Sequence, residues 1–159
     1  MPSSTSFRIR GLAPAPFVPL FALDDDALAA RGIQRFTIRE PHAAPCRISL
    51  VDAEPDERLL LLAYEHQPAA SPFQARGPIF IREGLETPFD AVNVIPDAVK
   101  RRTISARAYD NEAMMIEGEL VQGEALAPLL ETWLARPEVD VVHLHYARRG
   151  CYAALAQRA

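Results

Sequence analysis

Alternating apolar and polar positions along the chain predict a series of β-strands. Such alternation is typical of strands because successive side chains point to opposite faces of a sheet. Strands are expected at residues 7–10, 33–39, 46–51, 58–65, 78–83, 102–109, 114–121 and 139–146. The run at 58–65 is continuously apolar, which predicts a strand buried on both faces. The turn at 52–56 predicts a hairpin between the strands 46–51 and 58–65.

Two stretches have the pattern of helices. Apolar residues three, four and seven positions apart form one stripe along 124–135, and Pro137 ends this helix. A second helix is expected to begin after Asp24, a good N-cap, and to run to about Arg31. Many strands and few helices predict a single α+β domain over residues 1–159, in which two main helices pack on a largely antiparallel sheet.

Composition and charge narrow the class of protein. A length of 159 residues fits one domain, and 49% hydrophobic with 24% charged residues is ordinary for a globular chain. The net charge of −4 argues against nucleic-acid binding, and the basic pairs Arg101-Arg102 and Arg148-Arg149 are too short for a polybasic patch. No stretch approaches the ~20 apolar residues of a membrane helix. We therefore expect a cytoplasmic protein with reduced thiols and no membrane partner, and its oligomeric state stays open.

The segment 141–152 carries the residue types best suited to chemistry. His143 and His145 are two positions apart on a strand, so both imidazoles point to one face and could share a transition metal such as zinc or divide acid and base roles. Gly150 permits a turn that would bring Cys151 to the same face, and two preceding arginines favour the reactive thiolate. The more conservative interpretation is a hydrogen-bonded histidine pair and a thiol that packs in the core.

Three further candidates lie earlier in the chain. Tyr64 and His66 end the apolar strand and could line the rim of a pocket, although a strand end that becomes solvated is an equal alternative. Cys46 shares a strand face with two aliphatic residues, which favours a core thiol over a reactive one. Arg107 and Tyr109 share a face that either binds a carboxylate or phosphate or is simply solvated.

Five motifs, taken in order, resemble those of DUF1203, a family of bacterial proteins of unknown function. They are Phe7-Arg-Ile-Arg-Gly-Leu12, Pro45-Cys46-Arg47, Leu-Leu-x-Tyr64-Glu-His66-Gln, Ile79-Phe-Ile-Arg82, and His143-x-His145 followed by Gly150-Cys151-Tyr-Ala. The resemblance spans essentially the whole chain. It implies no activity, but it places the polar signature residues of the family at Cys46, Tyr64, His66, His143, His145 and Cys151. Tyr146 stands where the family pattern implies an Asn.

Two hypotheses for function follow. In the first, a small enzyme uses thiol or metal chemistry on a small anionic molecule. The residues expected to act chemically are Cys151, His145, His143 and His66, of which His143, His145 and Cys151 are also the expected metal ligands. Those expected to hold the substrate are Tyr64, Arg82, Arg149 and Cys46. In the second hypothesis, a non-catalytic domain binds a small molecule or a partner, and the cysteine and histidine residues are structural.

Overall fold

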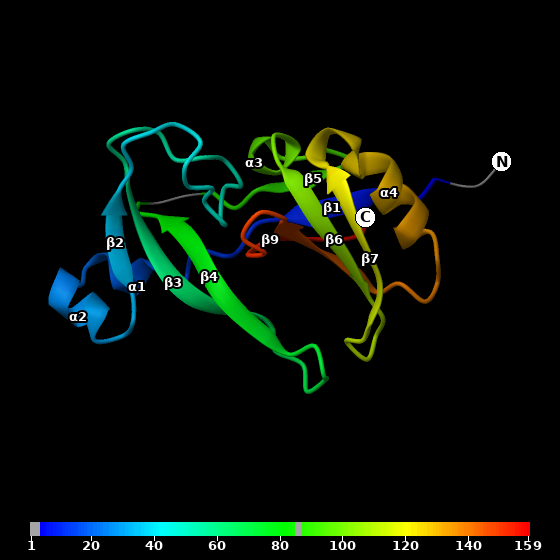
Figure 1. Cartoon of the computed structure of the whole chain (residues 1–159), viewed down its shortest axis with the longest axis horizontal. Helices are drawn as coiled ribbons and strands as arrows, with labels where there is room; N and C mark the ends of the chain where they lie inside the picture. Colours follow the sequence, from blue (N-terminus) through cyan, green and yellow to red (C-terminus); the bar gives the residue numbers. More distant parts are fainter. Residues whose placement is uncertain (1–3, 85–86) are drawn as a thin grey trace.

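The computed structural model describes residues 4–84 and 87–159, which form two antiparallel sheets with short helices around them (Figure 1). The larger sheet has the strand order β5-β1-β9-β8-β6-β7. Its strands are β1 (Phe7–Arg10), β5 (Asp90–Val92), β6 (Thr103–Tyr109), β7 (Met115–Gln122), β8 (Val141–Tyr146) and β9 (Tyr152–Arg158). The smaller sheet consists of β2 (Gln34–Thr37), β3 (Arg58–Gln67) and β4 (Ala75–Arg82), in that order.

The helices are shorter than the sequence pattern predicts. They are α1 (Val18–Phe21), α2 (Asp25–Ala29), α3 (Asp97–Lys100) and α4 (Leu126–Leu134), with a 3₁₀ turn, η1 (Gly123–Ala125), before α4. Asp24 caps α2 as expected, because its carboxylate accepts a hydrogen bond from the Ala27 amide at 2.8 Å. The α+β arrangement with antiparallel pairing is confirmed, whereas two main helices on a single sheet were expected and are not found. None of the described helices has the length and apolar character needed to cross a membrane.

The main core lies between α4 and one face of the larger sheet. The buried face of α4 presents Leu126, Leu130, Trp133 and Leu134. From β8, Val142 and Leu144 pack into the same core. Because side chains alternate along a strand, this arrangement directs His143 and His145 to the opposite face of the sheet.

A second core lies under α1 and α2 and includes Cys46, Ile48 and residues of β3 and β4. The strand expected at 46–51 is wrong. The chain instead turns, with the Leu50 amide donating to the Cys46 carbonyl at 3.1 Å and Leu50 at a φ of 56°. The expected hairpin between 46–51 and 58–65 is wrong for the same reason, and β3 pairs with β2 and β4.

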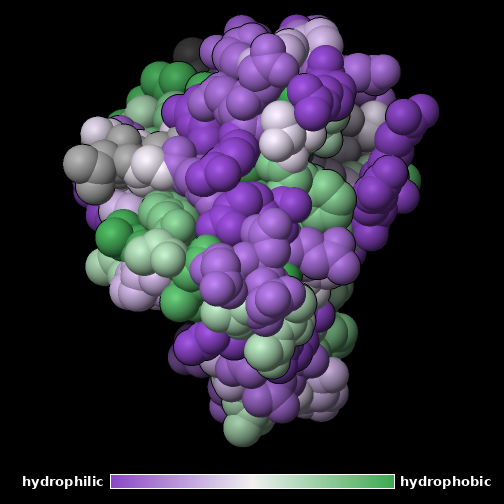
Figure 2. Space-filling view, turned by 90° about the vertical axis from the view of Figure 1, so that its left-hand side faces the viewer, coloured by the Kyte–Doolittle hydropathy of each residue, from purple (hydrophilic) through white to green (hydrophobic). Residues whose placement is uncertain are grey.

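The β3–β4 hairpin reaches across to the larger sheet on the face away from α4. At its tip, Ser71 Oγ donates to the Ala113 carbonyl at 2.9 Å, and the Phe73 ring packs edge-on against Tyr109 at 6.2 Å. The end of β3 is thereby held against β8. The opposite end of the molecule, which carries α2 and β2, is mostly hydrophilic with small apolar patches between (Figure 2).

Candidate functional site

Three imidazoles from two sheets meet where the end of β3 contacts β8. The His66 ring centroid lies 5.0 Å from that of His145 and 6.2 Å from that of His143, while the two rings on β8 are 6.3 Å apart. Tyr152 stacks on His66 at 5.4 Å with an interplanar angle of 11°. Arg107 is the cross-strand neighbour of His143 on β6. We call these five residues the histidine cluster.

Burial keeps the imidazoles of the histidine cluster neutral. The exposed fraction is 3% for His143 and 1% for His145. Burial lowers the pKa of His143 to about 4, and the charges of His66 and Arg107 act in the same direction. Burial likewise lowers the pKa of His145 to about 3. The pKa of His66 is also lowered, first by burial and then by Arg107.

Each imidazole has a buried nitrogen without a hydrogen-bond partner in the described structure. These atoms are Nδ1 of His66, Nδ1 of His143 and Nε2 of His145. The other nitrogen of His145, Nδ1, lies 2.8 Å from the Gly150 carbonyl. A carbonyl only accepts hydrogen bonds, so Nδ1 carries the proton and Nε2 keeps a bare lone pair.

The expected metal-ligand set of His143, His145 and Cys151 is not brought together. Gly150 does make a turn, with a φ of 79°, but Tyr152 is the residue that pairs with His145 and joins its face. Cys151, one position earlier, packs on the other side with the core that contains Tyr146. Within residues 4–84 and 87–159, no three His, Cys, Asp or Glu side chains are arranged to hold a metal ion.

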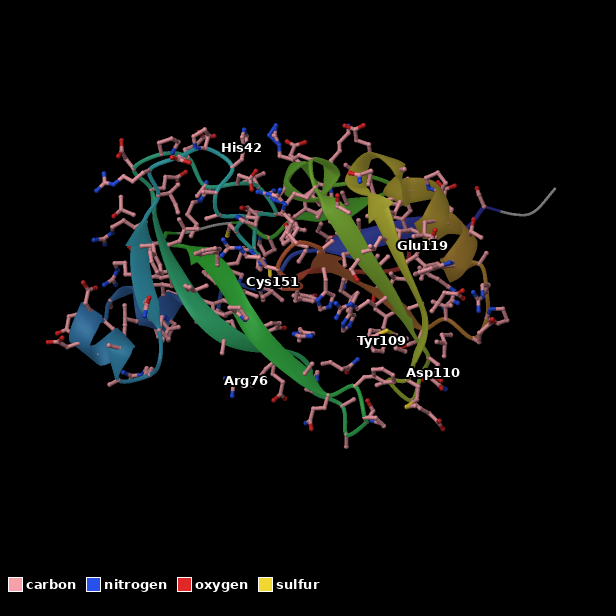
Figure 3. All side chains as sticks on the ribbon, viewed as in Figure 1. His42, Arg76, Tyr109, Asp110, Glu119 and Cys151 are labelled. Carbon is pink, nitrogen blue, oxygen red and sulfur yellow. The ribbon has the colours of Figure 1, made fainter. Side chains whose placement is uncertain are left out.

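Cys151 borders a separate cavity of about 470 Å³, which no residue of the histidine cluster lines. Five arginines line this arginine–cysteine cavity, together with other residues. The name refers to eight of the lining residues: Arg47, Arg101, Arg102, Arg148, Arg149, His42, Tyr146 and Cys151. Figure 3 labels two of them, His42 and Cys151, and one residue next to the histidine cluster, Tyr109 at the far end of β6. The fold therefore brings together Arg101-Arg102 and Arg148-Arg149, two pairs that are each too short alone for a polybasic patch.

Arg47 lines the cavity and also contacts the sulfur atom of Cys151. Its side chain is only 1% exposed, and its guanidinium donates to the Tyr152 carbonyl at 2.7 Å, to the Pro45 carbonyl, and to Cys151 Sγ at 3.2 Å. No carboxylate of the described residues pairs with this guanidinium. A buried charge without an opposite charge is costly, so this position favours negative charge on a neighbouring group.

Tyr146 forms the floor of the arginine–cysteine cavity between two guanidinium groups. Arg47 and Arg102 lie 4.9 and 5.2 Å from its ring centroid, at cation–π distance. The hydroxyl is buried and unpartnered, and burial raises the pKa of Tyr146 to about 12. It therefore keeps its proton at neutral pH and can donate a hydrogen bond. Asp52 offsets part of the local charge by pairing with Arg102 at 2.8 Å and His42 at 3.0 Å.

The other residues expected from the sequence are divided among different places. Arg149 lines the arginine–cysteine cavity, and Tyr64 packs against Tyr152 at 5.9 Å, beside the histidine cluster. Arg82 lines a neighbouring cavity and pairs with Glu57 at 3.3 Å.

Cys46 is fully buried in the second core, and both cysteines are free thiols. Its sulfur atom accepts hydrogen bonds from the backbone amides of Ile48 and Arg82 at 3.5 and 3.4 Å. These contacts agree with the interpretation of Cys46 as a core thiol rather than a residue of either site.

Seven residues of these two sites were not expected from the sequence: Tyr152 in the histidine cluster, and Arg47, Tyr146, His42, Arg101, Arg102 and Arg148 at the cavity. Arg47 follows Cys46 directly in the Pro-Cys-Arg motif, which was the available signal. Tyr152 follows Cys151 and would have been found if a strand had been expected over β9. Tyr146 continues the alternation of β8 on the face opposite the two histidines.

Comparison with known proteins gives one result. The chain from residue 43 to residue 158 matches the family model described as "Protein of unknown function (DUF1203)". This range contains the histidine cluster and all the named cavity residues except His42, but not the motif at residues 7–12. No curated protein and no solved structure matches the chain. Because the match covers most of the sequence, the chain belongs to the DUF1203 family.

Proposed function

We propose that this protein binds a small anionic molecule in the arginine–cysteine cavity and that Cys151 reacts with it as a thiolate nucleophile. The observation that carries the proposal is the hydrogen bond from the buried Arg47 guanidinium to Cys151 Sγ, inside a cavity bordered by four more arginines. Negative charge on the sulfur would compensate the buried guanidinium. A volume of about 470 Å³ suits a metabolite-sized ligand.

The residues have complementary roles in this proposal. Arg149 and Arg148, at the exposed rim, attract and hold the anion, and the Tyr146 hydroxyl donates a hydrogen bond at the floor. Cys151 attacks an electrophilic carbon, so that a carbon–sulfur bond forms and the displaced group leaves with the electron pair of the broken bond. This step needs no oxidant or reductant. Arg47 is a positioning residue that acts through the sulfur.

A pair of alkylating reagents tests the proposal. Iodoacetate is anionic and iodoacetamide is its neutral analogue, and both alkylate a thiolate with loss of iodide. The quantity compared is the ratio of the iodoacetate rate to the iodoacetamide rate, in the folded protein and in the urea-unfolded chain. If the cavity concentrates anions beside Cys151, this ratio should be at least about tenfold higher in the folded protein. The rates are measured by mass spectrometry of the peptide that contains Cys151, and the buried Cys46 serves as the internal unreactive thiol.

Matched variants distinguish an effect of the cavity from an effect of the overall charge of the protein. Arg149→Gln should remove most of the preference for iodoacetate, whereas Arg39→Gln, whose side chain is 77% exposed and outside the cavity, should leave it unchanged. Equal relative rates in folded and unfolded protein would reject the proposal.

A second candidate is a non-catalytic binding domain with a structural histidine cluster. The close ring packing of His66, His143 and Tyr152 favours a structural role for that cluster. In that case iodoacetate would show saturable binding that slows alkylation by iodoacetamide, without faster reaction of its own.

A further inference from the structure

Arg107 carries a charge that the described protein does not neutralise. It is half-buried on β6, and its Nε donates a hydrogen bond to the Ser105 hydroxyl at 3.2 Å. No carboxylate among residues 4–84 and 87–159 forms an ion pair with it. Its neighbours are instead the neutral imidazoles of His66, His143 and His145. A half-buried guanidinium in such surroundings can pair with an anion that reaches it from solvent.

The bare lone pair of His145 sets a second condition on any ligand. Because Nδ1 donates to the Gly150 carbonyl, Nε2 can only accept a hydrogen bond. This atom is buried and has no partner in the described structure. A purely accepting ligand would place one lone pair against another, so the complementary ligand must bring an O–H or N–H group.

His143 and His66 can adapt to such a ligand. Each neutral imidazole has one N–H and one bare nitrogen, and Nδ1 of both is buried without a partner. Only 3% of His143 is exposed, so its unpartnered nitrogen lies within the packed interior rather than in solvent. The described histidine cluster lacks the arrangement that a metal ion requires. These nitrogen atoms can instead form hydrogen bonds to a water or to a small molecule that enters the cluster.

We propose that the histidine cluster binds an oxyanion that also carries an O–H group, with Arg107 pairing with its charged oxygens and His145 Nε2 accepting a hydrogen bond from its O–H group. Hydrogen phosphate is the simplest such group, and a 2-hydroxy carboxylate presents the same combination. Access is from the side of Arg107 and His66, which are both partly exposed. No residue of the histidine cluster lines the arginine–cysteine cavity, and the inference does not depend on the function proposed for that cavity.

The chain contains four histidines, which makes imidazole ¹⁵N resonances a direct test. Three belong to the histidine cluster, and the fourth, His42, lines the arginine–cysteine cavity and reports on anions there. Phosphate at pH 7 should shift the resonances of His66, His143 and His145 and reach saturation. Sulfate has the charge of the hydrogen phosphate dianion but no proton, and it should bind at least about tenfold more weakly. Glycolate against acetate repeats the comparison and distinguishes a hydroxy acid from a phosphate ligand.

Two substitutions assign the discrimination to named atoms. Arg107→Gln should weaken phosphate binding about tenfold or more, while Arg76→Gln, on an exposed arginine of β4 that points away from the larger sheet in Figure 3, should leave it unchanged. His145→Gln should bring sulfate and phosphate affinities together, because an amide can rotate to donate to sulfate.

Three results would overturn the inference. The first is equal binding of sulfate and phosphate to the unmodified protein. The second is a response to phosphate confined to His42, which would assign the anion to the other cavity. The third is a saturating shift of the three clustered histidines by zinc chloride alone, without any effect of phosphate, which would indicate a metal centre.

Discussion

Mild acid should destabilise this fold through its two most buried histidines. His143 and His145 are neutral in the folded protein, with pKa values lowered by burial to about 4 and about 3. In the unfolded chain both return to an ordinary value near ~6.5. As the pH falls below this value, the unfolded chain takes up protons that the folded chain refuses. The free energy of unfolding therefore decreases from about pH 6.5 downward and levels off once the folded histidines are protonated too.

The expected size of the effect is large for a domain of this length. Between pH 7 and pH 5, each histidine should contribute a loss of about 2 kcal/mol, so that the two together remove about 4 kcal/mol. A typical total stability is only ~5–15 kcal/mol. The ordinary carboxyl groups titrate near ~4 and contribute little in this interval. His66 acts in the same direction, because its pKa is lowered as well.

Urea unfolding at pH 7, 6 and 5 measures this loss, with fluorescence of the single, buried Trp133 as the signal. In His143→Gln the loss between pH 7 and pH 5 should fall to about half, or ~2 kcal/mol. His42→Gln is the matched control, since that side chain is 57% exposed, and it should retain the full dependence. An unfolding free energy that is the same at pH 7 and pH 5, or an undiminished loss in His143→Gln, would refute the reasoning.

Two further predictions concern the scaffold. A Cβ atom on Gly11 would lie 1.9 Å from the Ile48 carbonyl oxygen, so Gly11→Ala should lower the free energy of unfolding by about 3 kcal/mol. A Cβ atom on Gly77 meets nothing within 4 Å, so Gly77→Ala should change this free energy far less. Urea titration of both variants checks the difference. Asp24→Ala removes the hydrogen bond to the Ala27 amide and should cost about 1 kcal/mol in the same assay, and no measurable loss would contradict the capping role.

The histidine pair shows what the sequence can reveal about a site. The two-residue period of a strand puts His143 and His145 on one face, and the structure confirms this because β8 is regular from Val141 to Tyr146. The arrival of His66 depends on how the β3–β4 hairpin crosses to the other sheet. That is a property of tertiary packing, and no local pattern around His66 encodes it.

Cys151 and the segment at 46–51 show where local patterns mislead. Gly150 was expected to return the thiol to the histidine face, but β9 begins at Tyr152, which occupies that face instead. The alternation of 46–51 resembles a strand, yet these residues turn between the two cores, with Leu50 at a positive φ. Pairing partners decide both outcomes, and they come from segments about a hundred residues apart, as in the contact between Arg47 and Cys151.

The strand order also determines when the larger sheet can assemble during synthesis. β1 lies between β5 and β9, and its register joins Phe7 to Arg158. β1 therefore waits for residues 152–158 before it can be joined to β8. The three-stranded sheet has no such dependence, since β2, β3 and β4 follow one another along the chain. Translation should thus expose the smaller sheet as an early folding unit, while the six-stranded sheet closes only after its last strand has emerged.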